Sequence, residues 1–211
     1  MNRTTFIIDG FNLYHSVVEA SWDLHNASTK WLDIHSLCKS YLHVIGNNSQ
    51  IENIYYFSAL AYHLQQNYPG KIHRHKLFIK ALESTGIIVK LGRFKTKEMY
   101  CDTCKKMITK HEEKETDVAM ATTIFEILIK NDADTIVIIS GDTDLAPVIR
   151  TAKDLFPKIN IIFAFPYNRV NRELKILSPK SFNINKESYL RHQFKEQIFY
   201  KGETLIKPEN W

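Results

Sequence analysis

The stretch that decides the fold reads TIVIISGDTD, residues 135–144. Five apolar or β-branched residues are followed directly by small and acidic ones, which is typical of a strand buried on both faces that ends in a turn. The earlier stretch TTFIIDGFN, residues 4–12, has the same pattern and places Asp9 at the end of its apolar run. Two such strands predict a parallel sheet whose carboxylates gather at one edge, where the strands end.

Strand-like and helix-like stretches alternate along the rest of the chain. Further strands are expected at residues 53–57, 87–91 and 158–165. Helices are expected at residues 12–20, 31–44, 69–84 and 145–155, with Pro69 opening the third and Gly86 stopping it. This alternation indicates βαβ units, and therefore an α/β fold in which a mainly parallel central sheet is flanked by helices on both faces.

One more helix is expected to begin near Thr116, which is a suitable N-cap and would place Asp117 in the first turn. Its apolar face is predicted from residues spaced three and four apart, namely Val118, Ala121, Ile124, Phe125, Leu128 and Ile129. A third carboxylate would then lie at the start of a helix, beside those at the strand ends.

The composition of the chain indicates its domain count, its location and the charge of its partner. A chain of 211 residues with 44% hydrophobic content can bury one good core, so one domain is expected. Three cysteines do not describe a secreted disulfide scaffold, and the chain runs at once into an apolar strand, so a cytoplasmic location is expected. Because no apolar run approaches the roughly 20 residues of a spanning helix, no membrane partner is expected. The net charge of +5 modestly favours a polyanionic partner.

The acidic residues Asp9, Asp117, Asp142 and Asp144 predict a cation site. Each alone has an ordinary explanation, because Asp-Gly after a strand is a common turn and Asp before a helix is a common cap. Together at one sheet edge they would repel one another unless a cation balanced them. Hard oxygen ligands without histidine favour Mg²⁺ or Mn²⁺.

Four stretches carry a resemblance to a known family: residues 6–13, 91–94, 111–118 and 139–145. In this order, and with Lys-Glu-x-Asp and Ser-Gly-Asp-x-Asp patterns together, the chain resembles the NYN domains of the PIN-like nuclease superfamily, especially their LabA-like branch. The resemblance implies a PIN-like three-layer sandwich and metal-dependent cleavage of RNA. It implies an NYN domain over residues 1–185. A polar, lysine-rich segment at about 92–113 interrupts the alternation and is predicted to be a cysteine-containing insert, and the less regular residues 186–211 are predicted to be a C-terminal extension.

Carried over by position, the resemblance makes Asp9, Asp117, Asp142 and Asp144 the metal-binding and catalytic carboxylates. Asn12 corresponds to the family's Asn after the first Asp and is a candidate catalytic and substrate-binding residue. Lys114 and Arg93 are candidate phosphate contacts. RNA is the expected partner, with another nucleic acid and a homodimer as open alternatives. Glu115 is either part of the site or only a favourable charge at a helix N-terminus.

The insert contains Cys101, Cys104 and His111, three potential ligands for a structural Zn²⁺ whose fourth ligand is not evident. The alternatives are a flexible turn with two reduced thiols or a Cys-x-x-Cys redox pair. The segment is also rich in lysine, which suits contact with an RNA backbone, and Phe94 or Tyr100 is a candidate for stacking on a base.

Two other functions fit part of the sequence. A regulatory or RNA-binding module with little catalytic activity would keep the fold and its charges. A nucleotide-sugar transferase would use Asp142-x-Asp144 to hold a metal diphosphate, but that function leaves Asp9, Asn12 and Asp117 without a shared role.

Overall fold

The computed structural model describes residues 1–103, 105–209 and 211. One seven-stranded sheet forms the centre, in the order β4-β3-β2-β1-β5-β6-β7, and all neighbours pair in parallel except β3 and β4. Its strands are β1 (Asn2–Asp9), β2 (Ser49–Ala59), β3 (Ile88–Cys101), β4 (Lys106–Lys114), β5 (Thr135–Ile139), β6 (Asn160–Phe165) and β7 (Phe182–Asn183).

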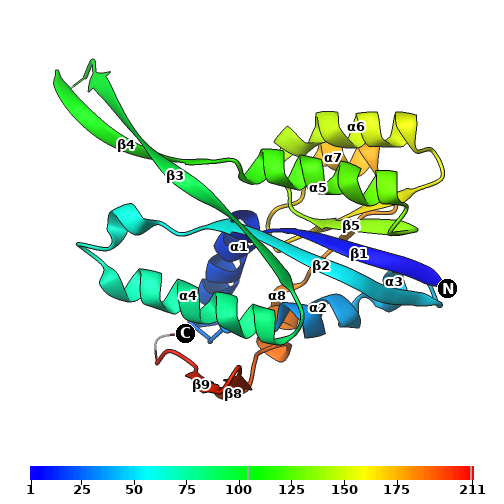
Figure 1. Ribbon diagram of the computed structural model, residues 1–211, viewed down its shortest axis with the longest axis horizontal. Helices are drawn as coiled ribbons and strands as arrows, with labels where there is room; N and C mark the ends of the chain where they lie inside the picture. The colour runs from blue at the N-terminus through cyan, green and yellow to red at the C-terminus, as the bar shows by residue number, and fades with distance from the viewer. Residues whose placement is uncertain (104, 210) are drawn as a thin grey trace.

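Helices cover both faces of this sheet (Figure 1). One face packs against α1 (Gly10–Asp23), α2 (Ile34–Ser40), α3 (Leu42–Ile45), α4 (Pro69–Ser84) and α8 (Lys186–Arg191). The other packs against α5 (Thr116–Lys130), α6 (Ala146–Leu155) and α7 (Arg172–Leu177). The predicted three-layer α/β sandwich is confirmed. No helix among the described residues is both long enough and apolar enough to cross a membrane.

The central strands carry apolar side chains on both faces, because a separate hydrophobic core packs against each face of the sheet. Phe6 and Ile8 of β1 belong to the core under α1 and α4, whereas Ile7 belongs to the core under α5 and α6. Strand β5 divides in the same way, with Val137 on the first side and Ile138 on the second. Side chains alternate across a strand, so a continuous apolar run fits this doubly covered position.

The strand order reverses between β1 and β5. Strand β1 pairs with β2 on one side and with β5 on the other, and Ile8 lies opposite Ile139. The loops that follow these two strands leave in different directions, which opens a crevice at their carboxyl ends. Asp9 and Ser140, the next residues of the two strands, therefore face each other across this point.

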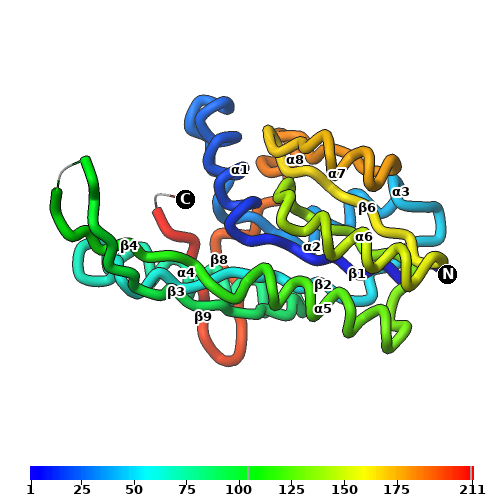
Figure 2. Tube along the Cα trace, turned by 90° about the horizontal axis from the view of Figure 1, so that it is seen from above, coloured from blue at the N-terminus to red at the C-terminus, as the bar shows by residue number. Residues whose placement is uncertain are grey.

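Residues 92–113, predicted to be a cysteine-containing insert, are mostly β-strand. Most of them extend β3 and form β4, so the segment is a two-stranded antiparallel ribbon that projects from the body (Figures 1 and 2). Nine residue pairs hold it together, from Arg93–Lys114 to Cys101–Lys106. Near its base, the Phe94 ring packs edge-on against both Phe11 and His63, which fastens the ribbon to the body.

Two helix predictions need correction. The stretch 31–44 is not one helix, because α2 ends at Ser40 and α3 begins at Leu42. In α5 the N-cap is Glu115, in a left-handed conformation, and Thr116 is already inside the helix.

The predicted apolar face of α5 is also partly wrong. Val118 and Ile129 are 67% and 74% exposed, while Met120 and Ile127 are buried. Packing against the sheet rotates the buried face, because the sequence offers apolar residues on several sides of this helix.

The C-terminal segment packs on the body through Trp31. This side chain is fully buried, and its indole Nε1 donates a hydrogen bond to the Lys195 carbonyl at 2.9 Å. Its ring lies edge-on to Phe194 and Trp211. The segment also contains a small hairpin, β8 (Gln197–Tyr200) and β9 (Glu203–Ile206), whose Leu205 is buried in the same core.

Replacing Trp31 with Ala is therefore expected to lower the free energy of unfolding by about 3–5 kcal/mol, because it leaves a large cavity. It is also expected to speed proteolysis after residue 191. Trp22→Ala is the matched control, since Trp22 is 67% exposed and its loss is expected to change stability by less than about 0.5 kcal/mol. Urea unfolding of both variants measures this, and equal losses would contradict the packing role of Trp31.

Candidate metal and nuclease site

Asp9 is the most enclosed of the candidate carboxylates, at 7% exposure. It ends β1 and caps α1, because Oδ1 accepts a 2.9 Å hydrogen bond from the Asn12 backbone N–H. Its other oxygen, Oδ2, accepts a 3.0 Å hydrogen bond from the Ser140 hydroxyl. Burial nevertheless raises the pKa of Asp9, and the nearby Asp142 adds to the increase, while the two hydrogen bonds oppose it.

A tight polar turn follows β5. The Ser140 hydroxyl that binds Asp9 also accepts a 3.1 Å hydrogen bond from the Asp142 backbone N–H. Asp142 then caps the short 3₁₀ turn η2 (Thr143–Leu145), with Oδ1 accepting from the Asp144 N–H at 3.1 Å. Ser140 thus connects the ends of the two central strands.

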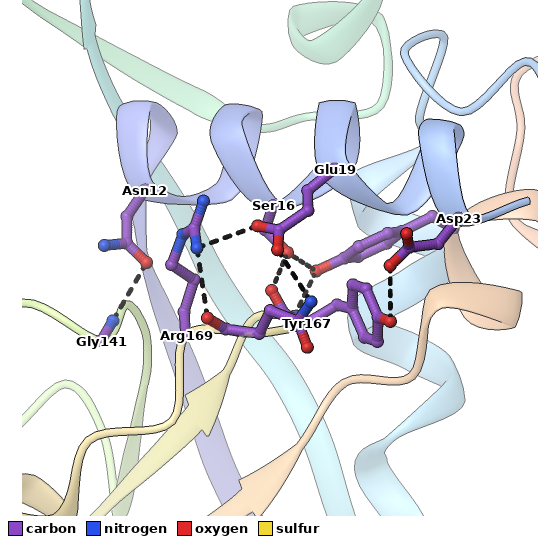
Figure 3. Close-up of polar contacts among 9 residues, drawn as sticks. Asn12, Ser16, Glu19, Asp23, Gly141, Tyr167 and Arg169 are labelled. Carbon is purple, nitrogen blue, oxygen red and sulfur yellow. Dashed lines mark hydrogen bonds and ion pairs between the residues drawn. The ribbon is translucent and has the colours of Figure 1, made fainter. Parts of the chain in front are cut away.

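The side chain of Asn12 binds this turn, whereas Asn12 binds Asp9 only through its backbone N–H. Its Oδ1 accepts a 3.1 Å hydrogen bond from the Gly141 backbone N–H, as Figure 3 shows. Gly141 sits so close to the next loop that an added Cβ would lie 2.0 Å from the carbonyl oxygen of Arg169. Only glycine fits here, so Asn12 and Arg169 enclose the start of the turn.

Polar side chains of helix α1 bind the loop that follows β6 (Figure 3). The Ser16 hydroxyl donates to the Tyr167 carbonyl at 2.7 Å, and the Tyr167 hydroxyl donates to Asp23 at 2.8 Å. Arg169 and Glu19 form an ion pair of 3.0 Å. The same helix therefore positions the loops after β1, β5 and β6.

Asp117 reaches the site from α5. Asp9 lies opposite Phe57 in the β1–β2 register, and Phe57 packs in the same core as Met120 of α5. Asp117 is exposed at the surface, yet partial desolvation raises its pKa, and Asp142, Asp9, Glu113 and Asp144 each raise it further through charge repulsion. The four predicted carboxylates thus share one electrostatic environment.

The donor set suits a hard divalent cation. Within the described residues, Asp9, Asp117, Asp142 and Asp144 form no ion pair with Lys, Arg or His. Among these residues no three acidic, histidine or cysteine side chains converge closely enough to form a direct ligand set. Mg²⁺ usually keeps several waters in proteins, so carboxylates at this spacing can hold it partly through water.

The two candidate phosphate contacts already have acidic neighbours. Arg93 pairs with Glu115, with Nη2 to Oε1 at 2.5 Å, and Lys114 pairs with Glu112 at 3.0 Å. Both side chains remain about half exposed. Exposed pairs of this kind are weak, so either cation can exchange its partner for a phosphate.

The structure separates the proposed zinc ligands. Cys101 lies opposite Lys106, and His111 lies five residues further along β4. At about 3.4 Å per residue this is about 17 Å, too far for one tetrahedral zinc ion. His111 instead stacks on His63 with ring centroids 4.0 Å apart. Cys104 lies outside the described residues.

Ser140 and Glu113 lie within the sequence motifs, but no role was predicted for either residue. Ser140 bridges Asp9 and Asp142. Glu113 accepts a hydrogen bond from the Thr116 backbone N–H, and its charge raises the pKa of Asp117. Their small or acidic side chains beside strand and helix ends were the available signal. Only the register brings them to the carboxylates.

A mainly parallel sheet with acidic residues at its switch point places the protein in the PIN-like class of α/β folds. The NYN domain family matches residues 3–182, which is most of the chain. The chain therefore belongs to the NYN domain family, a PIN-like nuclease family.

No curated protein matches this chain. Among solved structures, the chain resembles VPA0982, a protein of unknown function from Vibrio parahaemolyticus, with a TM-score of 0.54 and 14% identity. The match covers 87% of this chain and 93% of that one. At this identity, the likeness concerns the fold alone.

Asp117→Asn is expected to raise the melting temperature by a degree or two in metal-free buffer at pH 7. A carboxylate whose folded-state pKa is raised loses stability as pH rises from its ordinary pKa, near 4, through the folded value. The increase in melting temperature of Asp117→Asn over wild type should therefore vanish at about pH 4. Asp154→Asn, an exposed carboxylate near the end of α6, is the control. A melting temperature for Asp117→Asn that is lower than wild type at pH 7 would contradict the repulsion.

Proposed function

We propose that the protein is a metal-dependent endoribonuclease that hydrolyses RNA phosphodiester bonds at the switch point between β1 and β5. The observation that carries the proposal is the group of four carboxylates that form no ion pair with any cation of the described residues. Two of them, Asp9 and Asp117, have raised pKa values. Family membership supports the nuclease class. The motifs of the sequence support the finer placement in the LabA-like branch, and a cysteine content that does not describe a disulfide scaffold supports a cytoplasmic location.

In this proposal Asp9, Asp117, Asp142 and Asp144 hold one or two Mg²⁺ or Mn²⁺ ions. The bound ion supplies positive charge that activates water and stabilises the transition state. Ser140 keeps Asp9 oriented through its 3.0 Å hydrogen bond, and Asn12 fixes the turn that carries Asp142. Two backbone features, the α1 cap and the β5 turn, thus prearrange the carboxylates before substrate arrives.

Asp9→Asn and Asp142→Asn are each expected to reduce cleavage of labelled RNA in Mg²⁺ or Mn²⁺ by at least about 100-fold, since each removes one cation ligand. Asp154→Asn, prepared in parallel, is expected to retain full activity. RNA and DNA are compared under the same conditions. Cleavage that persists in both site variants would point to a contaminating nuclease.

The ribbon of β3 and β4 supports RNA as the partner because its register sorts charge onto one face. Arg93, Lys95 and Lys97 of β3 lie on the same face as their partners Lys114, Glu112 and Lys110, and Lys106 lies further along that face. Glu112 is the single acid among these residues, and the surrounding lysines hold its pKa below the usual value.

Like charges lie directly opposite each other on this face, Arg93 against Lys114 and Lys97 against Lys110. Such pairs destabilise a ribbon. Glu112 offsets part of this repulsion through its ion pairs with Lys110 and Lys114, and the positive charge that is left in excess favours a polyanionic partner. The opposite face is fastened to the body through Phe94 and His111. The cationic face is thereby turned away from the body and is open to a phosphate backbone.

The double variant Lys97→Gln, Lys110→Gln is expected to bind RNA about tenfold more weakly near 0.1 M salt. Its plot of log affinity against log salt concentration is expected to be shallower by about 1 to 2 units, because about two phosphate contacts are lost. Lys158→Gln, Lys180→Gln is the matched control, since both lysines are exposed and lie away from the ribbon. Fluorescence anisotropy measures both. Equal effects in the two double variants would remove the ribbon from the RNA interface.

The second candidate function is an RNA-binding or regulatory module with little activity. The cationic ribbon favours it as strongly as it favours a nuclease. RNA binding without cleavage in either metal would establish it. The transferase alternative is weaker, because Asp9 and Asn12 are hydrogen-bonded to the Ser140–Gly141 turn and share its site.

A further inference from the structure

A pocket of about 460 Å³ lies on the sheet face opposite to α5. It is bounded by the start of α1, the end of β2 and the first turns of α4. This volume falls within the range of sites for small molecules, which are mostly apolar with a few placed polar groups.

The interior of the pocket is aromatic and apolar. Tyr56 and Phe78 are buried in the core, and their rings lie edge-on with centroids 6.2 Å apart. Trp211 also lines the pocket, and its ring centroid lies 5.7 Å from that of Phe78. Gly10 lets α1 approach closely, because a Cβ there would lie 2.6 Å from the Tyr56 ring. Such walls suit a flat, weakly polar group.

Three cations line the pocket: Lys30, Lys71 and Arg74. Among the residues that the structure describes, none that lines the pocket is acidic, and none of the three cations forms an ion pair. Lys71 instead lies over the Tyr68 ring, 4.4 Å from its centroid. This charge distribution complements an anion, and phosphate is the anion that Arg and Lys together bind well.

His75 adds a neutral polar group to the wall. Burial lowers its pKa, and its Nε2 lies 3.2 Å from the Ser58 hydroxyl. A neutral imidazole both donates and accepts hydrogen bonds, so it can pair with the edge of a ring that carries nitrogen or oxygen.

The pocket is next to the carboxylate site, because residues that line it directly follow Asp9 and Phe57 in the sequence. Gly10 and Phe11 line it and directly follow Asp9. Ser58 also lines it and follows Phe57, the residue opposite Asp9 in the sheet. Pocket and carboxylates thus lie on opposite faces of the sheet but at the same strand ends.

We propose that this pocket binds one nucleotide of the RNA strand, with the base among the aromatic side chains and a phosphate at Lys30, Lys71 and Arg74. The choice of RNA rests on the proposed function. The nucleotide chemistry rests on the aromatic interior, the cationic lining and the neutral His75. A base held here would position the neighbouring phosphodiester bonds near the Asp9 edge and select cleavage at unpaired nucleotides.

Titration calorimetry with adenosine and uridine 5′-monophosphates, in buffer with EDTA, tests the pocket without any cleavage. At least one nucleotide is expected to bind, and inorganic phosphate or the nucleoside alone at least about tenfold more weakly. Arg74→Gln and Lys30→Gln are each expected to weaken nucleotide binding by about tenfold, through the loss of a charged hydrogen bond to phosphate.

Lys80→Gln is the matched control on the same helix. Lys80 pairs with Glu203 at 2.7 Å and does not line the pocket, so nucleotide binding should stay unchanged. Absence of nucleotide binding by the wild type, or an equal loss in Lys80→Gln and Arg74→Gln, would overturn the proposal. Because metal is absent, either result is independent of whether the carboxylate site cleaves RNA.

A competition experiment distinguishes a nucleotide of the RNA from a free nucleotide. If the pocket holds part of the strand, the monophosphate displaces a labelled single-stranded RNA, and Arg74→Gln weakens RNA binding. Simultaneous binding of both would overturn the assignment to the RNA strand and identify a site for a free nucleotide.

Discussion

The enclosed carboxylate of Asp9 is the constraint on which the site depends. A buried charge without enough compensation is costly, and here its compensation comes from two hydrogen bonds, one with the α1 backbone and one with Ser140 of the neighbouring strand end. These bonds fix the ends of β1 and β5 relative to each other. They also place Asp142 close enough to raise the pKa of Asp9, so the fold assembles charge that a cation would relieve.

Around this constraint the same sheet edge offers three different environments. Acidic side chains gather on the α5 side, an aromatic pocket with three cations lies on the α4 side, and lysines line one face of the β3–β4 ribbon. A nucleic acid needs these in combination: cations for its backbone, an aromatic surface for a base and a metal for its phosphodiester bond. The arrangement links the proposed chemistry to the proposed binding surfaces.

Prediction from sequence succeeded where a local signal and the tertiary environment agreed. The helix Pro69–Ser84 and the strand Thr135–Ile139 have the bounds that their proline, glycine and apolar patterns predict. It failed where distant contacts decided the structure. The lysine-rich residues 92–113 have no clear strand pattern, because neither face of the ribbon beyond its base is buried, and pairing between β3 and β4 alone makes them strands.

The sequence by itself determined the α/β class and the family motifs and supplied the four carboxylates proposed for the cation site, because these depend on short patterns at strand and helix ends. The tertiary structure alone decided their surroundings. Because of the strand register, Ser140 lies beside Asp9, most of the ribbon lysines share one face, and His111 lies far from Cys101. Register is fixed by contacts between residues far apart in the chain, which no local pattern records.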